Sequence, residues 1–141
     1  MAKLIDPSTE FGRRVAQRLR DERIIWLTTV SEVNEPHPRP VWFLWDGETF
    51  LIFSQAGTHK LEHIRGNPMV SLNLDGDGMG GDIIVFTGEA WADQQAPPKD
   101  QWDEYTQKYT EGMKRIGMTA QEFAAGYSVL LRVKPLRLRG H

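Results

Sequence analysis

The residues of this chain best suited to bind an anion lie in one short stretch, SQAGTHK, at positions 54–60. The pattern predicts a helix that begins at Thr58, a good N-cap, and ends at Gly66. A helix N-terminus concentrates free N–H groups and positive potential, which favours anions over cations. A lysine in the first turn is therefore unfavourable alone and well placed beside a phosphate. The predicted anion site comprises the helix amides and the side chains of Ser54, Thr58, His59 and Lys60.

The other candidate segments do not match known metal-binding or nucleophile motifs. The segment HKLEH (59–63) has its glutamate directly before the second histidine, whereas the zinc-protease motif has it directly after the first. The segment DGDGMGGDIIVF (75–86) has phenylalanine where a calcium loop needs its bidentate glutamate, so we expect a hairpin loop there. No catalytic triad or carboxylate pair stands out. We predict no metal site and assign no catalytic residue.

A second cation precedes a strongly apolar stretch. Arg39 begins RPVWFLW (39–45), and an Asp-Gly turn joins this stretch to TFLIFS (49–54), which predicts a hairpin of two strands. Arg39 is either an exposed residue at a strand end or a second ligand for the anion. Trp42 is either a core or interface residue or a neighbour of a flat ligand lying along the strand.

The remaining elements predict a mainly β, α+β domain covering residues 1–141. A first helix should be capped by Asp6 and end near Arg23, with its arginines on a solvated face. A helix after Pro98 should bury Trp102, Tyr105, Tyr109 and Met113, and a shorter one should begin at Thr119. Six antiparallel strands with a polar connection at 31–38 favour a small closed or split barrel. The predicted strands are 24–30, 39–45, 49–54, 69–75, 82–93 and 127–139, the last with a bulge at Pro135-Leu136.

Composition narrows the class of protein. The chain has 141 residues, 40% of them hydrophobic, a formal net charge of −2 and no cysteine, so disulfides and thiolate chemistry are excluded. No apolar run is long enough for a signal peptide or a membrane span. We therefore expect a cytoplasmic protein that binds neither membranes nor nucleic acid.

The stretch RPVWFLWDGETFLIFSQAGTHKLEHIRGNPMVSLNLD (39–75) resembles the pyridoxamine 5'-phosphate oxidase-like superfamily of split-barrel flavin and deazaflavin proteins. The resemblance is closest to the short deazaflavin branch that uses F(420). It implies a six-stranded split antiparallel barrel of the FMN-binding type, and a homodimer with two cofactor sites at the subunit interface. The strand residues Arg39, Pro40, Val41 and Trp42 would follow the cofactor's ring system and ribityl chain. The residues implied to hold its phosphate are Phe53, Ser54, Thr58, His59 and Lys60.

The resemblance also shapes the expected activity. His59 stands where the oxidase commonly has an arginine, and the oxidase's C-terminal residues that grip pyridoxamine phosphate have no counterpart here, so that activity is not expected. We expect an oxidoreductase that uses FMN or F(420) to transfer a hydride to or from an unidentified small molecule. The alternative is a non-catalytic carrier of a flavin or haem. The residues alone leave the choice of cofactor open.

Overall fold

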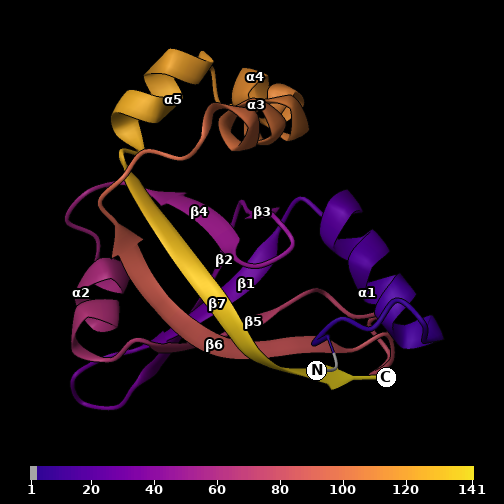
Figure 1. Cartoon of the computed structure of the whole chain (residues 1–141). Helices are drawn as coiled ribbons and strands as arrows, with labels where there is room; N and C mark the ends of the chain where they lie inside the picture. Colours follow the sequence, from indigo (N-terminus) through magenta and orange to yellow (C-terminus); the bar gives the residue numbers. More distant parts are fainter. Residues whose placement is uncertain (1–2) are drawn as a thin grey trace.

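The computed structural model describes residues 3–141 and consists of one curled antiparallel sheet with helices around it (Figure 1). The sheet has seven strands in the order β2-β1-β5-β6-β7-β4-β3. These strands are β1 (Ile25–Val30), β2 (Pro36–Val41), β3 (Leu44–Trp45), β4 (Phe50–Ser54), β5 (Met69–Asn73), β6 (Ile84–Asp93) and β7 (Val129–Gly140). The helices are α1 (Glu10–Asp21), α2 (His59–Gly66), α3 (Lys99–Lys108), α4 (Thr110–Arg115) and α5 (Ala120–Gly126). None of them is long and apolar enough to cross a lipid bilayer.

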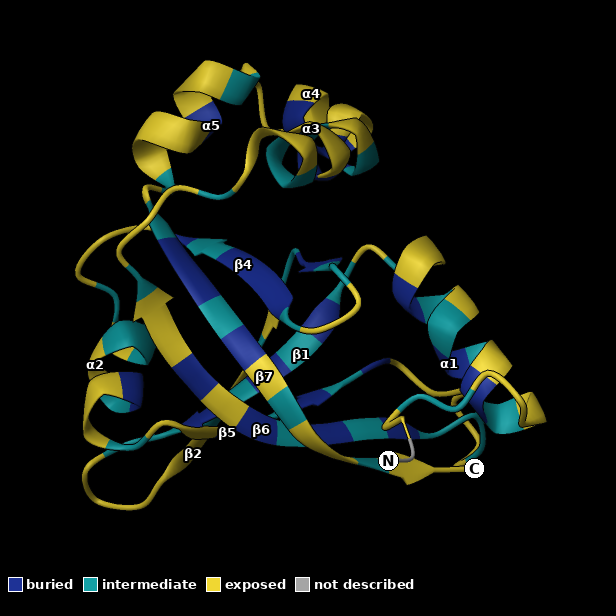
Figure 2. Cartoon of the chain, viewed as in Figure 1, coloured by how far each residue is buried: buried dark blue, intermediate teal, exposed yellow. Residues whose placement is uncertain are grey.

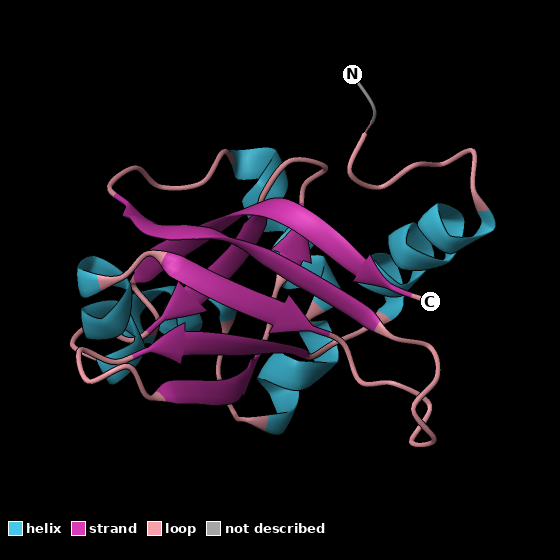
Figure 3. Ribbon diagram, turned by 90° about the horizontal axis from the view of Figure 1, so that it is seen from below, coloured by secondary structure: helices cyan, strands magenta, loops and turns pink. Residues whose placement is uncertain are grey.

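The two edges of the sheet come together because the chain joins them directly. β2 and β3 lie at opposite ends of the strand order, yet only Trp42 and Phe43 separate them in sequence. Three Cα steps span at most about 11 Å, so the sheet must curl until its edges meet. The view from below shows the strands crossing one another around the core (Figure 3). The predicted split barrel is confirmed, and its seam lies at Trp42-Phe43.

The prediction of six strands was wrong because a proline-rich stretch forms an edge strand. β2 begins at Pro36, inside the predicted connection, and the predicted strand 39–45 is divided between β2 and β3. Pro36, Pro38 and Pro40 pair with Val30, Thr28 and Trp26 of β1. Alternate residues of an edge strand direct their N–H groups away from the neighbouring strand, so three prolines of the same parity cost no ladder hydrogen bond. They also block pairing with a further strand.

Buried positions alternate along most of β6 (Figure 2), and one bulge interrupts the pairing of β6 with β7. The β6–β7 register shifts between Thr87 and Gly88, which face Arg137 and Pro135, so Leu136 is left unpaired and the predicted bulge is confirmed. A Cβ atom at Gly88 would lie 2.3 Å from the Lys134 carbonyl oxygen. This close approach requires glycine.

The first helix begins one turn later than predicted. Thr9, not Asp6, is the N-cap: its hydroxyl accepts the Gly12 N–H at 2.9 Å. Asp6 instead accepts hydrogen bonds from Ser8 in the turn before the helix. The arginine face is also only partly solvated. Arg14 and Arg18 form ion pairs of 2.8 and 2.7 Å with Asp82, which fasten α1 to the segment before β6.

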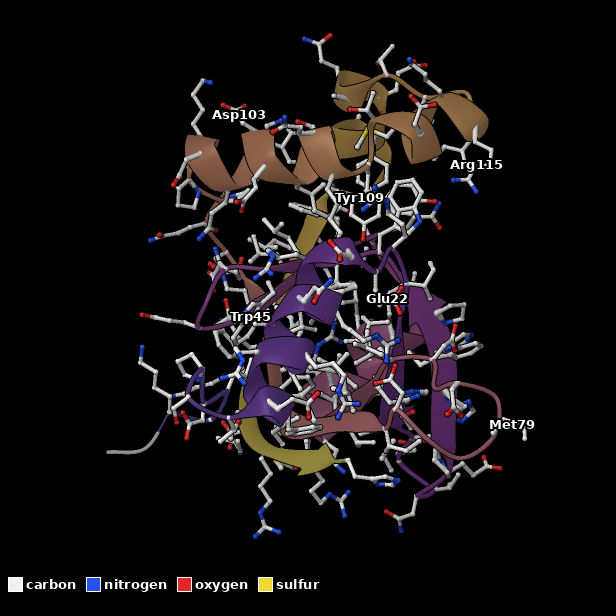
Figure 4. All side chains as sticks on the ribbon, turned by 90° about the vertical axis from the view of Figure 1, so that its right-hand side faces the viewer. Glu22, Trp45, Met79, Asp103, Tyr109 and Arg115 are labelled. Carbon is white, nitrogen blue, oxygen red and sulfur yellow. The ribbon has the colours of Figure 1, made fainter. Side chains whose placement is uncertain are left out.

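Helices α3, α4 and α5 form a separate layer over one end of the barrel (Figure 1). Tyr109 lies on the side of this layer that faces the barrel, whereas Asp103 lies on the outer side (Figure 4). The Tyr109 hydroxyl accepts the Phe43 N–H at 2.8 Å and lies 2.9 Å from the Phe43 carbonyl oxygen. The Lys108 ammonium donates to the same carbonyl at 2.9 Å. The helical layer therefore satisfies backbone groups at the seam.

A largely buried arginine ties the helical layer to β6, to β7 and to the turn between β3 and β4. The Arg132 side chain on β7 is only 13% exposed. Its Nε donates to Asp93 at 2.9 Å, one Nη donates to Asp46 at 3.3 Å, and the other donates to Gln101 of α3 at 3.1 Å. Every nitrogen of the guanidinium is thus used within the protein, so Arg132 is a structural residue.

Candidate functional site

A pocket of about 320 Å³ lies between the barrel seam, the start of α2 and the helical layer. Five of the nine predicted cofactor-binding residues line it: Pro40, Val41, Trp42, Phe53 and Lys60. The rest of its wall consists of Ile24, Tyr105, Ile116, Phe123 and Tyr127. Apart from Lys60, no lining side chain carries a charge, so the pocket is an apolar space with a cation at one end.

Two cations without an anionic partner meet at this end of the pocket. Lys60 is half-buried, and burial followed by the nearby charge of Arg39 lowers the pKa of its ammonium. The Nε atom of Arg39 is buried and has no hydrogen-bond partner. Within residues 3–141, neither side chain forms an ion pair or a side-chain hydrogen bond. Two neighbouring cations repel each other, so this corner of the fold is arranged to favour an anion.

The start of α2 adds free backbone donors to the two cations. Thr58 occupies the predicted N-cap position, but its hydroxyl bonds the Ser54 hydroxyl at 3.2 Å and caps no N–H group, so the predicted cap bond was wrong. Ser54 is buried and donates to the Gln55 carbonyl at 2.9 Å. Among the described residues, the N–H groups of His59 and Lys60 have no acceptor. These donors are available to a ligand.

His59 lies apart from the other predicted residues. Its side chain is 86% exposed, and its Nδ1 lies 3.6 Å from Glu62 on the outer side of α2. His63, which was not predicted, points inward instead: its Nδ1 lies 2.8 Å from the hydroxyl of the buried Thr29. Its ring centroid is 4.8 Å from that of His37 on β2. Desolvation, followed by the charges of His37 and Arg39, lowers the pKa of His63. The sequence signal for this contact was Thr29, a polar residue within the apolar stretch 24–30.

The aromatic wall comes from helices that sequence reasoning did not connect to the site. Trp42 stacks on Tyr109 at 4.5 Å between ring centroids and on Phe123 at 5.5 Å. A Cβ atom at Gly112 would lie 2.9 Å from the indole. Trp42 is therefore chiefly a packing residue between the seam and the helical layer. Phe53 meets Tyr105 edge to face at 4.7 Å and carries the wall across to β4.

A curled antiparallel sheet, closed at one seam and followed by a short helix whose N-terminus faces unpaired cations, defines a split barrel of the FMN-binding type. Residues 11–141 match the family model described as pyridoxamine 5'-phosphate oxidase. The chain belongs to this family.

Two curated relatives support the assignment. General stress protein 26 of Bacillus subtilis is 30% identical over 106 residues, which are 73% of this chain and 75% of that protein. The pyridoxine/pyridoxamine 5'-phosphate oxidase of Pseudoalteromonas translucida is 30% identical over 92 residues, which are 62% of this chain. The matched region is only 43% of the second protein, so this chain corresponds to less than half of it.

Solved structures share the fold at lower identity. Rv2991 from Mycobacterium tuberculosis has a TM-score of 0.69 and 21% identity, and the match covers 99% of this chain and 88% of that one. An FAD-binding protein from Mesorhizobium loti has a TM-score of 0.65 and 19% identity, and the match covers 89% of this chain and 88% of that one. An F(420) reductase has a TM-score of 0.62 and 20% identity, and the match covers 87% of this chain and 94% of that one. HutZ, the haem storage protein of Vibrio cholerae, has a TM-score of 0.60 and 18% identity, and the match covers 90% of this chain and 92% of that one. At these identities the likeness is one of fold.

Proposed function

We propose that this protein binds FMN or the deazaflavin F(420), with the cofactor's phosphate at the N-terminus of α2. The observation that carries the proposal is the unpaired cation pair of Lys60 and Arg39 beside the free N–H groups of His59 and Lys60. A phosphate accepts several hydrogen bonds at once and would relieve the repulsion between the two cations. The pair therefore has the donors and the charge that a phosphate needs.

The cofactor's ring system would lie along Pro40, Val41 and Trp42, toward the apolar part of the pocket. In the FMN-binding type of site the cofactor supplies the hydride chemistry when bound, and the protein supplies position and electrostatics. This chain's contribution is a preformed wall: Trp42 is fixed by stacking on Tyr109, and Phe53 is fixed by its edge-to-face contact with Tyr105. We infer an oxidoreductase that passes a hydride to or from a small molecule in this pocket.

We also propose a homodimer with the cofactor site at its interface. The outer face of the sheet supports this proposal because it exposes large apolar side chains: Met69 is 43% exposed and Trp91 is 40% exposed. The register places both on the same face, since Met69 pairs with Glu89, two residues before Trp91. Apolar side chains gathered on one face are typical of a surface that a partner covers. Size-exclusion chromatography with light scattering, on wild type and on Trp91→Glu, would test it: a dimer that the charge dissociates is the expected result.

The experiment that tests cofactor binding is a parallel titration with FMN, riboflavin and F(420). Riboflavin has the ring system of FMN but no phosphate, so it isolates the proposed anion site. We expect FMN or F(420) to bind, and riboflavin to bind more weakly than FMN. Equal affinities for FMN and riboflavin, with no binding of F(420), would overturn the proposal.

A carrier is the second candidate function. Its support is the lining of the pocket, which among the described residues contains no carboxylate and no histidine to act as a general acid or base. A protein of the same fold, HutZ, is named for haem storage. Reduction of a dye acceptor by the reduced, cofactor-loaded protein separates the candidates: turnover supports the oxidoreductase, and its absence supports the carrier.

A further inference from the structure

One buried polar group of a residue that lines the pocket has no hydrogen-bond partner in the fold. Tyr105 on α3 is fully buried, and its hydroxyl is one of three buried side-chain polar atoms in residues 3–141 that lack a hydrogen-bond partner. A buried hydroxyl without a partner destabilises a protein, so natural structures hold few of them. Tyr109, one helical turn further on, shows the usual arrangement, with its hydroxyl bonded to backbone groups of Phe43 and Arg23. The unpaired Tyr105 hydroxyl therefore needs an explanation outside the packing.

The surroundings of Tyr105 are those of a small-molecule site. Tyr105 lines the 320 Å³ pocket together with Phe53, Phe123 and Tyr127, which supply aromatic surface on several sides. Their rings hold fixed positions: Phe53 meets Tyr105 edge to face, and Phe123 stacks on Tyr127 at 4.5 Å. Small-molecule pockets range from about 300 to 1,000 Å³ and combine apolar walls with a few polar groups. This pocket lies at the small end of that range.

We propose that this pocket binds the small-molecule substrate, a flat, uncharged, largely apolar compound whose carbonyl or similar acceptor oxygen takes a hydrogen bond from the Tyr105 hydroxyl. As a statement about the substrate, the proposal rests on the proposed function. As a statement about a binding site, it rests only on the pocket and on Tyr105.

The chemistry of the walls sets the ligand class. Stacked and edge-to-face rings select flat apolar molecules. The one charged lining residue, Lys60, lies at the end assigned to the phosphate, and the cofactor's ring system is assigned to Pro40, Val41 and Trp42. The space lined by Tyr105, Phe123 and Tyr127 therefore favours a neutral ligand. Burial, and then the neighbouring phenols of Tyr109 and Tyr127, raise the pKa of Tyr105, so its hydroxyl stays protonated and acts as a donor. A ligand oxygen that accepts this hydrogen bond completes the site.

The test uses two probes that differ by one acceptor group. 2-Acetylnaphthalene carries a carbonyl on a flat bicyclic hydrocarbon, and naphthalene is the same ring system without it. Isothermal titration calorimetry would compare their affinities for wild type, Tyr105→Phe and the matched control Tyr109→Phe, all in the absence of cofactor. We expect wild type to prefer 2-acetylnaphthalene by about three- to tenfold, the scale of one net hydrogen bond. Tyr105→Phe should lose the preference, and Tyr109→Phe should keep it.

Thermal unfolding gives a second, independent readout. Because its hydroxyl has no partner, Tyr105→Phe should leave the Tm unchanged or raise it, whereas Tyr109→Phe should lower it. The proposal is overturned if neither probe binds wild type, if Tyr105→Phe retains the preference, or if Tyr105→Phe lowers the Tm as Tyr109→Phe does. The FMN titration remains separate. If the protein binds flavin but does not distinguish the two probes, only the inference about the pocket is overturned. If it distinguishes the probes but does not bind flavin, only the proposed function is overturned.

Discussion

Replacing Lys60 by methionine removes a charge from the proposed phosphate site while keeping the unbranched stem of the side chain. In the ligand-free protein, burial and the charge of Arg39 both oppose the Lys60 ammonium, and no described residue neutralises it. Lys60→Met should therefore leave the free energy of unfolding unchanged or slightly higher. A residue held at a stability cost in the free protein is typical of a ligand site.

The expected effect on cofactor binding follows from the bond that is lost. A hydrogen bond to a charged group contributes about 1.5–3 kcal/mol, which corresponds to about a 10- to 150-fold change in Kd. The affinity of Lys60→Met for FMN should be lower than that of wild type by this factor. Riboflavin, which has no phosphate, should bind wild type and variant equally. The difference between the two flavins isolates the contact between Lys60 and the phosphate from any change in the ring site.

Quenching of flavin fluorescence in a titration at fixed salt gives both dissociation constants. Lys114→Met is the matched control, because Lys114 is 71% exposed and its neighbour is Glu111 on the outer side of the helical layer. The control should change neither affinity. Equal weakening of FMN and riboflavin by Lys60→Met, or a lower Tm with unchanged FMN affinity, would show that Lys60 supports the fold and not the phosphate.

The stability of the ligand-free protein should also depend on pH through Lys60. Its pKa is lowered in the folded state, so the folded protein binds this proton less readily than the unfolded chain does. The resulting destabilisation is fully present below the folded pKa and disappears as pH rises toward the unfolded value of about 10.4. The difference in unfolding free energy between Lys60→Met and wild type should therefore shrink at alkaline pH. A difference that grows with pH would contradict this account.

Three further predictions concern the framework around the site, and urea unfolding checks each of them. Tyr109→Phe should lower the free energy of unfolding by about 1–3 kcal/mol, because a buried backbone group of Phe43 loses its partner; no loss would mean that the seam needs no such bond. Arg132→Met should cost about 1–3 kcal/mol by removing the hydrogen bonds to Asp93, Asp46 and Gln101, and an unchanged stability would contradict the structural role of Arg132. The Gln95 N–H, and then Arg132, lower the pKa of Asp93, so its contribution should be complete above about pH 4 and be lost as pH falls further. Gly88→Ala should cost about 1–3 kcal/mol because its Cβ meets the bulge backbone, and a neutral result would contradict the bulge geometry.

Local signals predicted the parts of this molecule that depend on a few neighbouring residues. Thr58 marks the start of α2, and Pro135-Leu136 marks the bulge in β7, because capping positions and missing ladder donors act within one turn or one pair. The strand predicted over 69–75 is likewise present as β5. The cation at Lys60 could be recognised for the same reason, since a helix N-terminus is a local feature.

Contacts between distant segments account for what the sequence did not reveal. Pro36 and Pro38 looked like part of a connection, and only the position of β2 at the sheet edge makes its three prolines harmless. Arg18 reaches Asp82, 64 residues away, instead of solvent. None of these choices has a signature within a short window, because each depends on which strands are neighbours.

The helical layer shows how one amphipathic pattern can serve two purposes. Tyr105 and Tyr109 lie on the same buried face of the helical layer, as predicted, yet only Tyr109 reaches the unpaired backbone of Phe43. Because Tyr109 and Lys108 bind the seam, the helical layer is part of the barrel's closure, and the pocket wall that it forms is fixed before any ligand arrives. A fixed wall places the Tyr105 hydroxyl in the same position with and without cofactor. The preference for an acceptor oxygen should therefore be measurable in the cofactor-free protein and persist after FMN is added.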